Sequence, residues 1–188
     1  MQMHIWDVYW GLRVEQCPCD VHFVEWLEEQ GVTDRRIYHF GTGGHHYVGI
    51  RCNEPELNNT VLGITASPKE YDAFVKLAIE NPTITKTYSA YFGDIYTSNA
   101  RLLPRFDIVT LFHSCEFRSE KNDAYGALTD LEVMQLFTDQ TDAGGHIVFY
   151  TGSFAYETAR PVIAEWAKSR PVEEVGSFKT LRIFRKLG

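Results

Sequence analysis

The stretch from Ile37 to Gly49, IYHFGTGGHHYVG, carries the strongest single signal in this chain. Its first residues are mostly apolar, and a glycine cluster, Gly41, Gly43 and Gly44, follows at once. This pattern is typical of a buried strand that passes into a tight turn, where the backbone approaches another group closely. That group is often a nucleotide. We therefore predict a ligand loop here, with a plain strand-to-helix turn as the alternative.

The composition is that of an ordinary globular protein. With 188 residues, of which 44% are hydrophobic and 23% charged, the chain is long enough to bury a full core. We see no internal repeat, low-complexity tract or linker in the sequence. We expect one domain over residues 1–188, in which residues 1–19 form an N-terminal extension.

The charge and hydropathy of the chain restrict its partners. A formal net charge of -7 argues against nucleic acid, because a long phosphate footprint calls for a clustered excess of Lys and Arg. No apolar run approaches the ~20 residues that span a bilayer, and the N-terminus lacks the basic-then-apolar pattern of a secretion signal. We expect a cytoplasmic protein that binds a small-molecule substrate and neither a membrane nor nucleic acid. The oligomeric state stays open.

The cysteines offer a weak metal motif. Cys17, Cys19 and His22 form a C-P-C-x-x-H run that can in principle bind zinc. Only three ligands are close together, however, and their spacing is not that of a zinc finger. We expect free thiols in a reducing compartment and no metal.

Strand and helix patterns alternate along the chain. Ser67 is the predicted N-cap of a helix in which Pro68 comes first and Glu70 completes a capping box. Asp20 is predicted to cap an earlier helix that ends at Gly31. The predicted strands are 36–40, 60–65, 84–91, 106–112 and 146–151, the last after an Ala-Gly-Gly turn; the helices are 20–31, 66–81, 128–138 and 155–169; residues 47–52 are helical or irregular; and 172–178 with 180–186 form a closing hairpin. Repeated strand-to-helix transitions indicate a parallel sheet with crossover helices.

This order of elements resembles the class I, Rossmann-like S-adenosylmethionine-dependent methyltransferases. The resemblance covers roughly residues 20–186: a strand with GxG, a strand and a helix, a strand ending in Gly93-Asp94, a strand beginning Phe106-Asp107, then a helix and a hairpin. It implies an α/β fold with a doubly wound, mostly parallel seven-stranded sheet of order 3-2-1-4-5-7-6, helices on both faces and a C-terminal antiparallel hairpin. It also implies S-adenosylmethionine as cofactor and methyl transfer to an unidentified small substrate.

The resemblance places candidate cofactor-binding residues. Gly41 and Gly43 match the loop whose backbone faces the methionine part of the cofactor. Asp94 matches the carboxylate that accepts a hydrogen bond from the adenine amino group, with Ile95 beside the ring; a solvated turn aspartate is the alternative. The methionine-end acid is replaced by His39.

The second strand also departs from the usual pattern. It ends in Thr65 instead of the acid that holds both ribose hydroxyls. The GITxS form from Gly63 to Ser67 is similar to that of the cyclopropane fatty acid synthase branch, which manages without this acid. A hydroxyl can still make one hydrogen bond to a ribose.

Catalytic candidates follow from the predicted topology. If the first and fourth strands are neighbours, their carboxyl ends bring His39, His45 and His46 toward His113, Cys115 and Glu116. Such a cluster can supply general bases or ligate a metal, and the alternative is ordinary packing and turn capping. We expect catalysis to involve His113, His46 and Glu116.

Two other functions remain in view. The first is a degenerate member of the fold that has lost catalysis and serves as a ligand-binding or protein-interaction module, because fold alone does not establish function. The second is a nicotinamide-dependent oxidoreductase. It is weaker, because GTGGHH does not complete GxGxxG and no acid ends the second strand.

Overall fold

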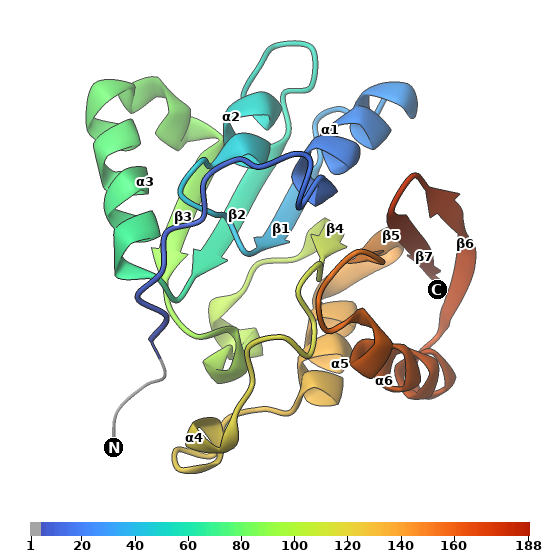
Figure 1. Cartoon of the computed structure of the whole chain (residues 1–188). Helices are drawn as coiled ribbons and strands as arrows, with labels where there is room; N and C mark the ends of the chain where they lie inside the picture. Colours follow the sequence, from blue (N-terminus) through green and yellow to red (C-terminus); the bar gives the residue numbers. More distant parts are fainter. Residues whose placement is uncertain (1–4) are drawn as a thin grey trace.

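The computed structural model describes residues 5–188, which form a seven-stranded sheet of order β3-β2-β1-β4-β5-β7-β6 (Figure 1). Strands β1 to β5 are parallel, and β7 runs antiparallel to both β5 and β6. The predicted order and the closing hairpin are confirmed. The strands are β1 (Arg36–Phe40), β2 (Thr60–Thr65), β3 (Tyr88–Phe92), β4 (Phe106–Thr110), β5 (Thr141–Tyr150), β6 (Val172–Phe178) and β7 (Leu181–Lys186).

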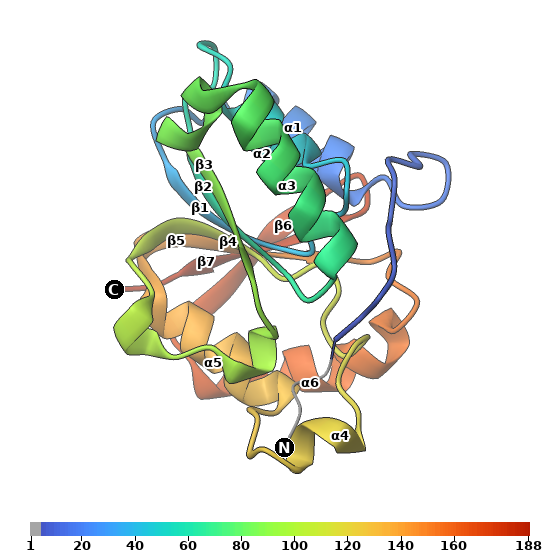
Figure 2. The ribbon, with the colours of Figure 1, turned by 90° about the vertical axis from the view of Figure 1, so that its left-hand side faces the viewer.

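Helices cover both faces of the sheet. Figures 1 and 2 show α1, α2 and α3 on one face and α5 and α6 on the other. Each face has its own apolar core, so the central strands are buried on both sides and read as nearly continuous apolar runs. The helices are α1 (Cys19–Glu29), α2 (Tyr47–Cys52), α3 (Pro68–Glu80), α4 (Glu120–Asp123), α5 (Asp130–Gln140) and α6 (Tyr156–Ser169). No helix within residues 5–188 is both long enough and apolar enough to cross a bilayer.

The predicted starts of the third and fifth strands are wrong. The third strand begins at Tyr88, because Pro82–Lys86 forms a turn of 3-10 helix in which Ile84 is buried as an anchor. Gly144 and Gly145 do not form a turn before the fifth strand but lie inside β5, where the pairing with β4 is irregular. Gly144 adopts a φ of 80°, a conformation that glycine permits at such an irregularity.

The start of α3 is confirmed in part. Ser67 is the N-cap and accepts the Glu70 N–H, and Pro68 is the first helical residue. The Glu70 carboxylate, however, does not return to the Ser67 N–H as a capping box requires. That N–H donates to the Thr65 hydroxyl oxygen instead, and the Glu70 side chain is left to bond elsewhere.

The predicted cap of α1 is wrong. Pro18 precedes the first helical residue, Cys19, and no side chain caps the helix. Asp20 lies inside the first turn and is 3% exposed. Its position one residue later turns the carboxylate away from the helix end and toward the carboxyl edge of the sheet.

Residues 5–18, which we call the N-terminal strap, cross the carboxyl ends of β2 and β1 (Figures 1 and 2). The Trp6 N–H donates to the Ala66 carbonyl oxygen across 3.1 Å, and the Gly44 N–H donates to the Trp10 carbonyl oxygen across 2.8 Å. The strap is therefore tied to the strand ends and to the glycine loop. Residues 1–4 of the expected N-terminal extension lie outside the described residues.

Candidate functional site

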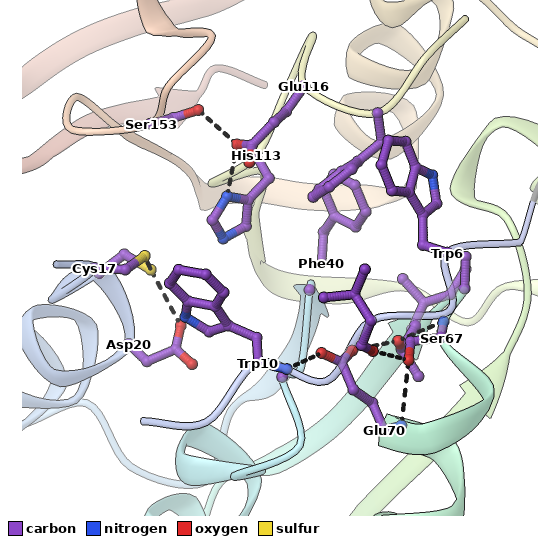
Figure 3. A pocket seen from close by; sticks show the side chains of 18 of the residues that line it. Trp6, Trp10, Cys17, Asp20, Phe40, Ser67, Glu70, His113, Glu116 and Ser153 are labelled. Carbon is purple, nitrogen blue, oxygen red and sulfur yellow. Dashed lines mark hydrogen bonds and ion pairs between the residues drawn. The ribbon is translucent and has the colours of Figure 1, made fainter. Parts of the chain in front are cut away.

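A cavity of about 300 Å³ lies at the carboxyl edge of the sheet, between the glycine loop and the strap. Carboxyl edges of parallel sheets are where such folds bind ligands. Figure 3 shows Cys17 and Asp20 on one side of this cavity, Ser67 and Glu70 on another, and His113 above them. Of the predicted cofactor residues, the lining includes Gly41, Gly43, Thr65 and Ile95.

The positions of Gly41 and Gly43 in the glycine loop leave no room for a side chain. Gly41 and Gly43 have φ values of 87° and 55°, in the left-handed region that favours glycine. A Cβ on Gly41 would lie 3.0 Å from the His113 ring, and one on Gly43 would lie 2.5 Å from His45 Nε2. The loop therefore brings bare backbone to the cavity, as its sequence predicts.

Asp20 is the acid that the sequence reasoning missed. Its carboxylate lines the cavity from α1, with His39 Nε2 at 3.6 Å and His45 Nε2 at 3.7 Å. Burial would raise the pKa of Asp20, but His39, His45 and His113 outweigh burial and lower it. Among residues 5–188, no N–H or O–H donor lies within hydrogen-bond distance of this carboxylate, and the Cys19 thiol is its one donor, at 3.5 Å. A buried ionised carboxylate without strong donors fits a cationic ligand.

A second acid reaches the end of β2 from α3. Glu70 Oε2 accepts the Thr65 hydroxyl proton across 2.6 Å, and Glu70 Oε1 accepts the Trp10 N–H across 3.0 Å. Burial raises the pKa of Glu70. The acid missing from the strand is thus replaced by one from the helix that follows it.

His113 and Glu116 form a hydrogen-bonded pair on the β4 side of the cavity, where both line its wall. His113 Nδ1 lies 2.9 Å from Glu116 Oε2, which also accepts the Ser153 hydroxyl proton across 2.9 Å. Burial would lower the pKa of His113, but the Glu116 carboxylate reverses this and raises it. Burial would raise the pKa of Glu116, but the hydrogen bond to His113 outweighs burial and lowers it.

The structure corrects the prediction of His46 as a catalytic base. His46 is 3% exposed and outside the cavity lining. Its Nε2 donates to the Glu70 carbonyl oxygen across 2.9 Å, so its Nδ1 accepts the Tyr88 hydroxyl proton across 2.7 Å. Burial lowers its pKa to about 4. With both ring nitrogens occupied, His46 is a neutral core residue.

His39 and Cys115 are also turned away from the cavity. His39 Nδ1 lies 2.8 Å from Thr110 Oγ1 on the neighbouring strand, so His39 touches the site only through Asp20. The Cys115 N–H donates to Asp130, and burial raises the pKa of the Cys115 thiol to about 12. Of the expected cluster, the fold brings His45, His113 and Glu116 to the cavity wall.

Asp94 holds a loop in this structure. Its Oδ2 accepts hydrogen bonds from Asn122 Nδ2, at 2.9 Å, and from the Tyr125 hydroxyl, and its Oδ1 accepts the Tyr96 N–H. Its neighbours Gly93 and Ile95 line the cavity, but Asp94 does not. Asp94, the predicted adenine partner, therefore bonds to residues of the loop after β4 in this structure.

The thiols of the C-P-C run lie in the cavity wall, but His22 does not join them. Cys17 and Cys19 both line the cavity. His22 Nδ1 lies 2.7 Å from Thr180 Oγ1, in the turn before β7. The hydrogen bond with Cys19 lowers the pKa of Cys17 to about 7.

No protein-family model and no curated protein matches this sequence. Solved structures do match its fold. The N-methyltransferase NodS from Bradyrhizobium japonicum WM9, in complex with S-adenosyl-L-homocysteine, has a TM-score of 0.62 and 13% identity, covering 89% of this chain and 86% of that chain. The precorrin-6y C5,15-methyltransferase from Geobacter metallireducens GS-15 has a TM-score of 0.61 and 12% identity, with 100% of both chains covered.

A third similar structure belongs to an enzyme with a different activity. The [4+2]-cyclase SpnF has a TM-score of 0.60 and 15% identity, covering 92% of this chain and 65% of that chain. The chain therefore has the class I methyltransferase fold, which is shared at this level of identity by enzymes of more than one activity.

Proposed function

We propose that this protein binds S-adenosylmethionine in the cavity at the sheet edge and transfers its methyl group to a small substrate. The observation that carries this proposal is Asp20. Its buried, ionised carboxylate faces the cavity near Gly41 and Gly43 without a strong donor of its own. The methionine end of the cofactor carries an ammonium group, which is the kind of cation that such a carboxylate pairs with.

The cavity fits the rest of the cofactor in its chemistry. Glu70, already bonded to Thr65, offers carboxylate lone pairs to the ribose hydroxyls. Ile95 and Phe40 are apolar wall residues for a flat ring. A volume of about 300 Å³ is at the lower end of ligand pockets, because the strap covers the cleft. We infer that the strap remains over the bound cofactor as a cover.

The chain's own residues would align the acceptor. Bound S-adenosylmethionine supplies a methyl group on a positively charged sulfur, which a nucleophile attacks directly. Glu116 fixes the His113 ring through Nδ1, so Nε2 is the atom that meets the acceptor and takes its proton. Tyr150 and Ser153 complete this side of the wall. We place the substrate beside the β4 and β5 ends.

Calorimetry with S-adenosylmethionine and S-adenosylhomocysteine tests the proposal. We expect one ligand per chain, and at about 100 times the dissociation constant a stabilisation of ~2.7 kcal/mol in thermal unfolding. NAD serves as the control ligand and tests the oxidoreductase alternative. A flat response to both sulfur ligands at millimolar concentration would rule out the cofactor assignment.

The second candidate is a binding module without methyl transfer. SpnF keeps it open, because that protein has a similar fold and is a cyclase, so the fold by itself does not imply methyl transfer. S-adenosylmethionine with a tritium-labelled methyl group distinguishes the transferase from the binding module. The protein is incubated with this cofactor and the low-molecular-mass fraction of a cell extract. Label leaving the cofactor for another compound supports the transferase. Tight S-adenosylmethionine binding with no transfer supports the module.

A further inference from the structure

We propose that Cys17, Cys19 and His113 form a zinc site in the wall of the cavity. One ligand atom from each of the three residues lies within 4.8 Å of the other two. The two sulfurs are 3.4 Å apart. All three residues line the cavity, and Figure 3 shows Cys17 at one side of it with His113 above.

The spacing suits a tetrahedral ion. Two thiolates bound at ~2.3 Å to one zinc ion lie ~3.8 Å apart, close to the separation of Cys17 Sγ and Cys19 Sγ. Cys17 comes from the end of the N-terminal strap, Cys19 is the first residue of α1, and His113 comes from the loop after β4. The site is therefore assembled from two distant parts of the chain, with a geometry that a small side-chain movement completes.

His113 is oriented as a metal-binding histidine. Its Nδ1 lies 2.9 Å from Glu116 Oε2, and the Ser153 hydroxyl donates to the same oxygen. A carboxylate on one ring nitrogen fixes the tautomer and leaves the other nitrogen for the metal. In Figure 3 the second ring nitrogen points away from Glu116 into the cavity, which is the direction of the glycine loop.

The charges are also consistent with a cofactor beside the metal. Two thiolates cancel the charge of Zn²⁺, so Asp20, 3.5 Å from the Cys19 sulfur, keeps its negative charge for an ammonium group. Three protein ligands leave a fourth position open to the cavity, the arrangement typical of catalytic zinc. A metal there would bind the acceptor and lower its pKa, taking over the proton-accepting role assigned above to His113.

Metal titration of the full-length, reduced and chelator-treated protein tests this site without S-adenosylmethionine. We expect one Zn²⁺ per chain by calorimetry, and thiolate-to-metal absorption when Co²⁺ is used as the probe. C17S, C19S and H113N each abolish stoichiometric binding. E116Q weakens binding by ~10- to 100-fold, because it removes the carboxylate that orients His113.

Two matched controls separate this site from the alternatives. H22N removes the histidine of the C-P-C-x-x-H run, and C115S removes a thiol outside the cavity; both keep one Zn²⁺ per chain. Absence of stoichiometric binding by the unaltered protein overturns the proposal whether or not the variants fold. Binding that survives H113N but is lost in H22N also overturns it. S-adenosylmethionine binding, measured separately with chelator present, reports on the proposed function alone.

Discussion

Thr65 donates its hydroxyl proton to Glu70 Oε2 across 2.6 Å, so a carboxylate from α3 stands at the end of β2. The other Glu70 oxygen accepts the Trp10 N–H across 3.0 Å. One side chain thus joins the strand end, the helix and the strap. The end of β2 therefore carries an acid that the strand itself does not encode.

Substituting E70Q tests this role. The amide has one accepting oxygen for the two donors, Thr65 and Trp10, and we expect S-adenosylmethionine to bind ~10-fold more weakly, because charged hydrogen bonds contribute about 1.5–3 kcal/mol. Calorimetry measures the change. E80Q, at the exposed end of the same helix, is the control. Equal affinities for E70Q and E80Q would contradict the assignment.

D20N should separate ligand binding from stability. Without ligand, we expect a modestly lowered melting temperature, because His39, His45 and His113 hold the pKa of Asp20 below its usual value and the folded state therefore favours its charged form. S-adenosylmethionine should bind ~10- to 100-fold more weakly. Exposed D72N provides the control for loss of one negative charge. A strongly lowered melting temperature in D20N would show that the carboxylate is structural.

G43A and G126A form a matched pair of strained substitutions. Both glycines have positive φ, 55° and 67°, so each alanine costs about 1–3 kcal/mol of stability. Only at Gly43 does the new Cβ meet other atoms, 2.5 Å from His45 Nε2, whereas nothing lies within 4 Å at Gly126. We expect both variants to melt earlier and only G43A to lose ligand binding, as measured by chemical denaturation and calorimetry. Equal ligand affinities would place the ligand away from the loop.

D94A distinguishes a loop anchor from an adenine partner. Removing the carboxylate leaves Asn122 and Tyr125 without their shared acceptor, so we expect faster proteolysis within residues 114–127. Affinity for S-adenosylmethionine should fall less than in D20N. D123A, at an exposed acid of the same loop, is the control. A larger affinity loss in D94A than in D20N would restore the adenine assignment.

The lowered pKa of His46 predicts that the protein loses stability in acid. Burial lowers its pKa in the folded state to about 4, against about 6.5 when unfolded, so the unfolded chain binds the proton first. The stability that neutral His46 contributes is present above pH ~6.5 and falls by about 3 kcal/mol as the pH approaches 4. Urea unfolding from pH 7 to pH 4.5 measures this loss, which H46Q should lack. Parallel pH profiles for the two proteins would show that His46 titrates normally.

Much of the fold was predictable because local patterns are strong along this chain. The first and second strands match their predicted ranges residue for residue, since apolar runs bounded by glycine or a helix cap leave few alternatives. The sequence predicts a third strand from residue 84, before the true start at Tyr88, because Ile84 is as apolar in a 3-10 turn as in a strand. Helix caps were less secure. Asp20 has the right chemistry for a cap but lies one residue inside the helix.

Of the residues predicted for the site, the glycines that present bare backbone line the cavity, as do His113 and Glu116, whereas His46 and Asp94 do not. Gly41 and Gly43 line the cavity with their backbone, so their position does not depend on a side-chain rotamer. His46 and Asp94 were plausible from their positions next to strand ends, but the rotation of each side chain sends them to Tyr88 and to Asn122. Periodicity does not fix where a loop side chain points.

The sequence by itself therefore determined the order of strands and helices, the parallel sheet and the position of the glycine loop, because these follow from hydrophobic pattern and backbone conformation. Only the tertiary structure decided which polar groups meet in the cavity. Asp20 and Glu70 reach it from helices that flank the strands, and Cys17 meets His113 across 96 positions of the chain, from 17 to 113. Side chains brought together by packing of distant elements leave no mark in the local pattern of either one.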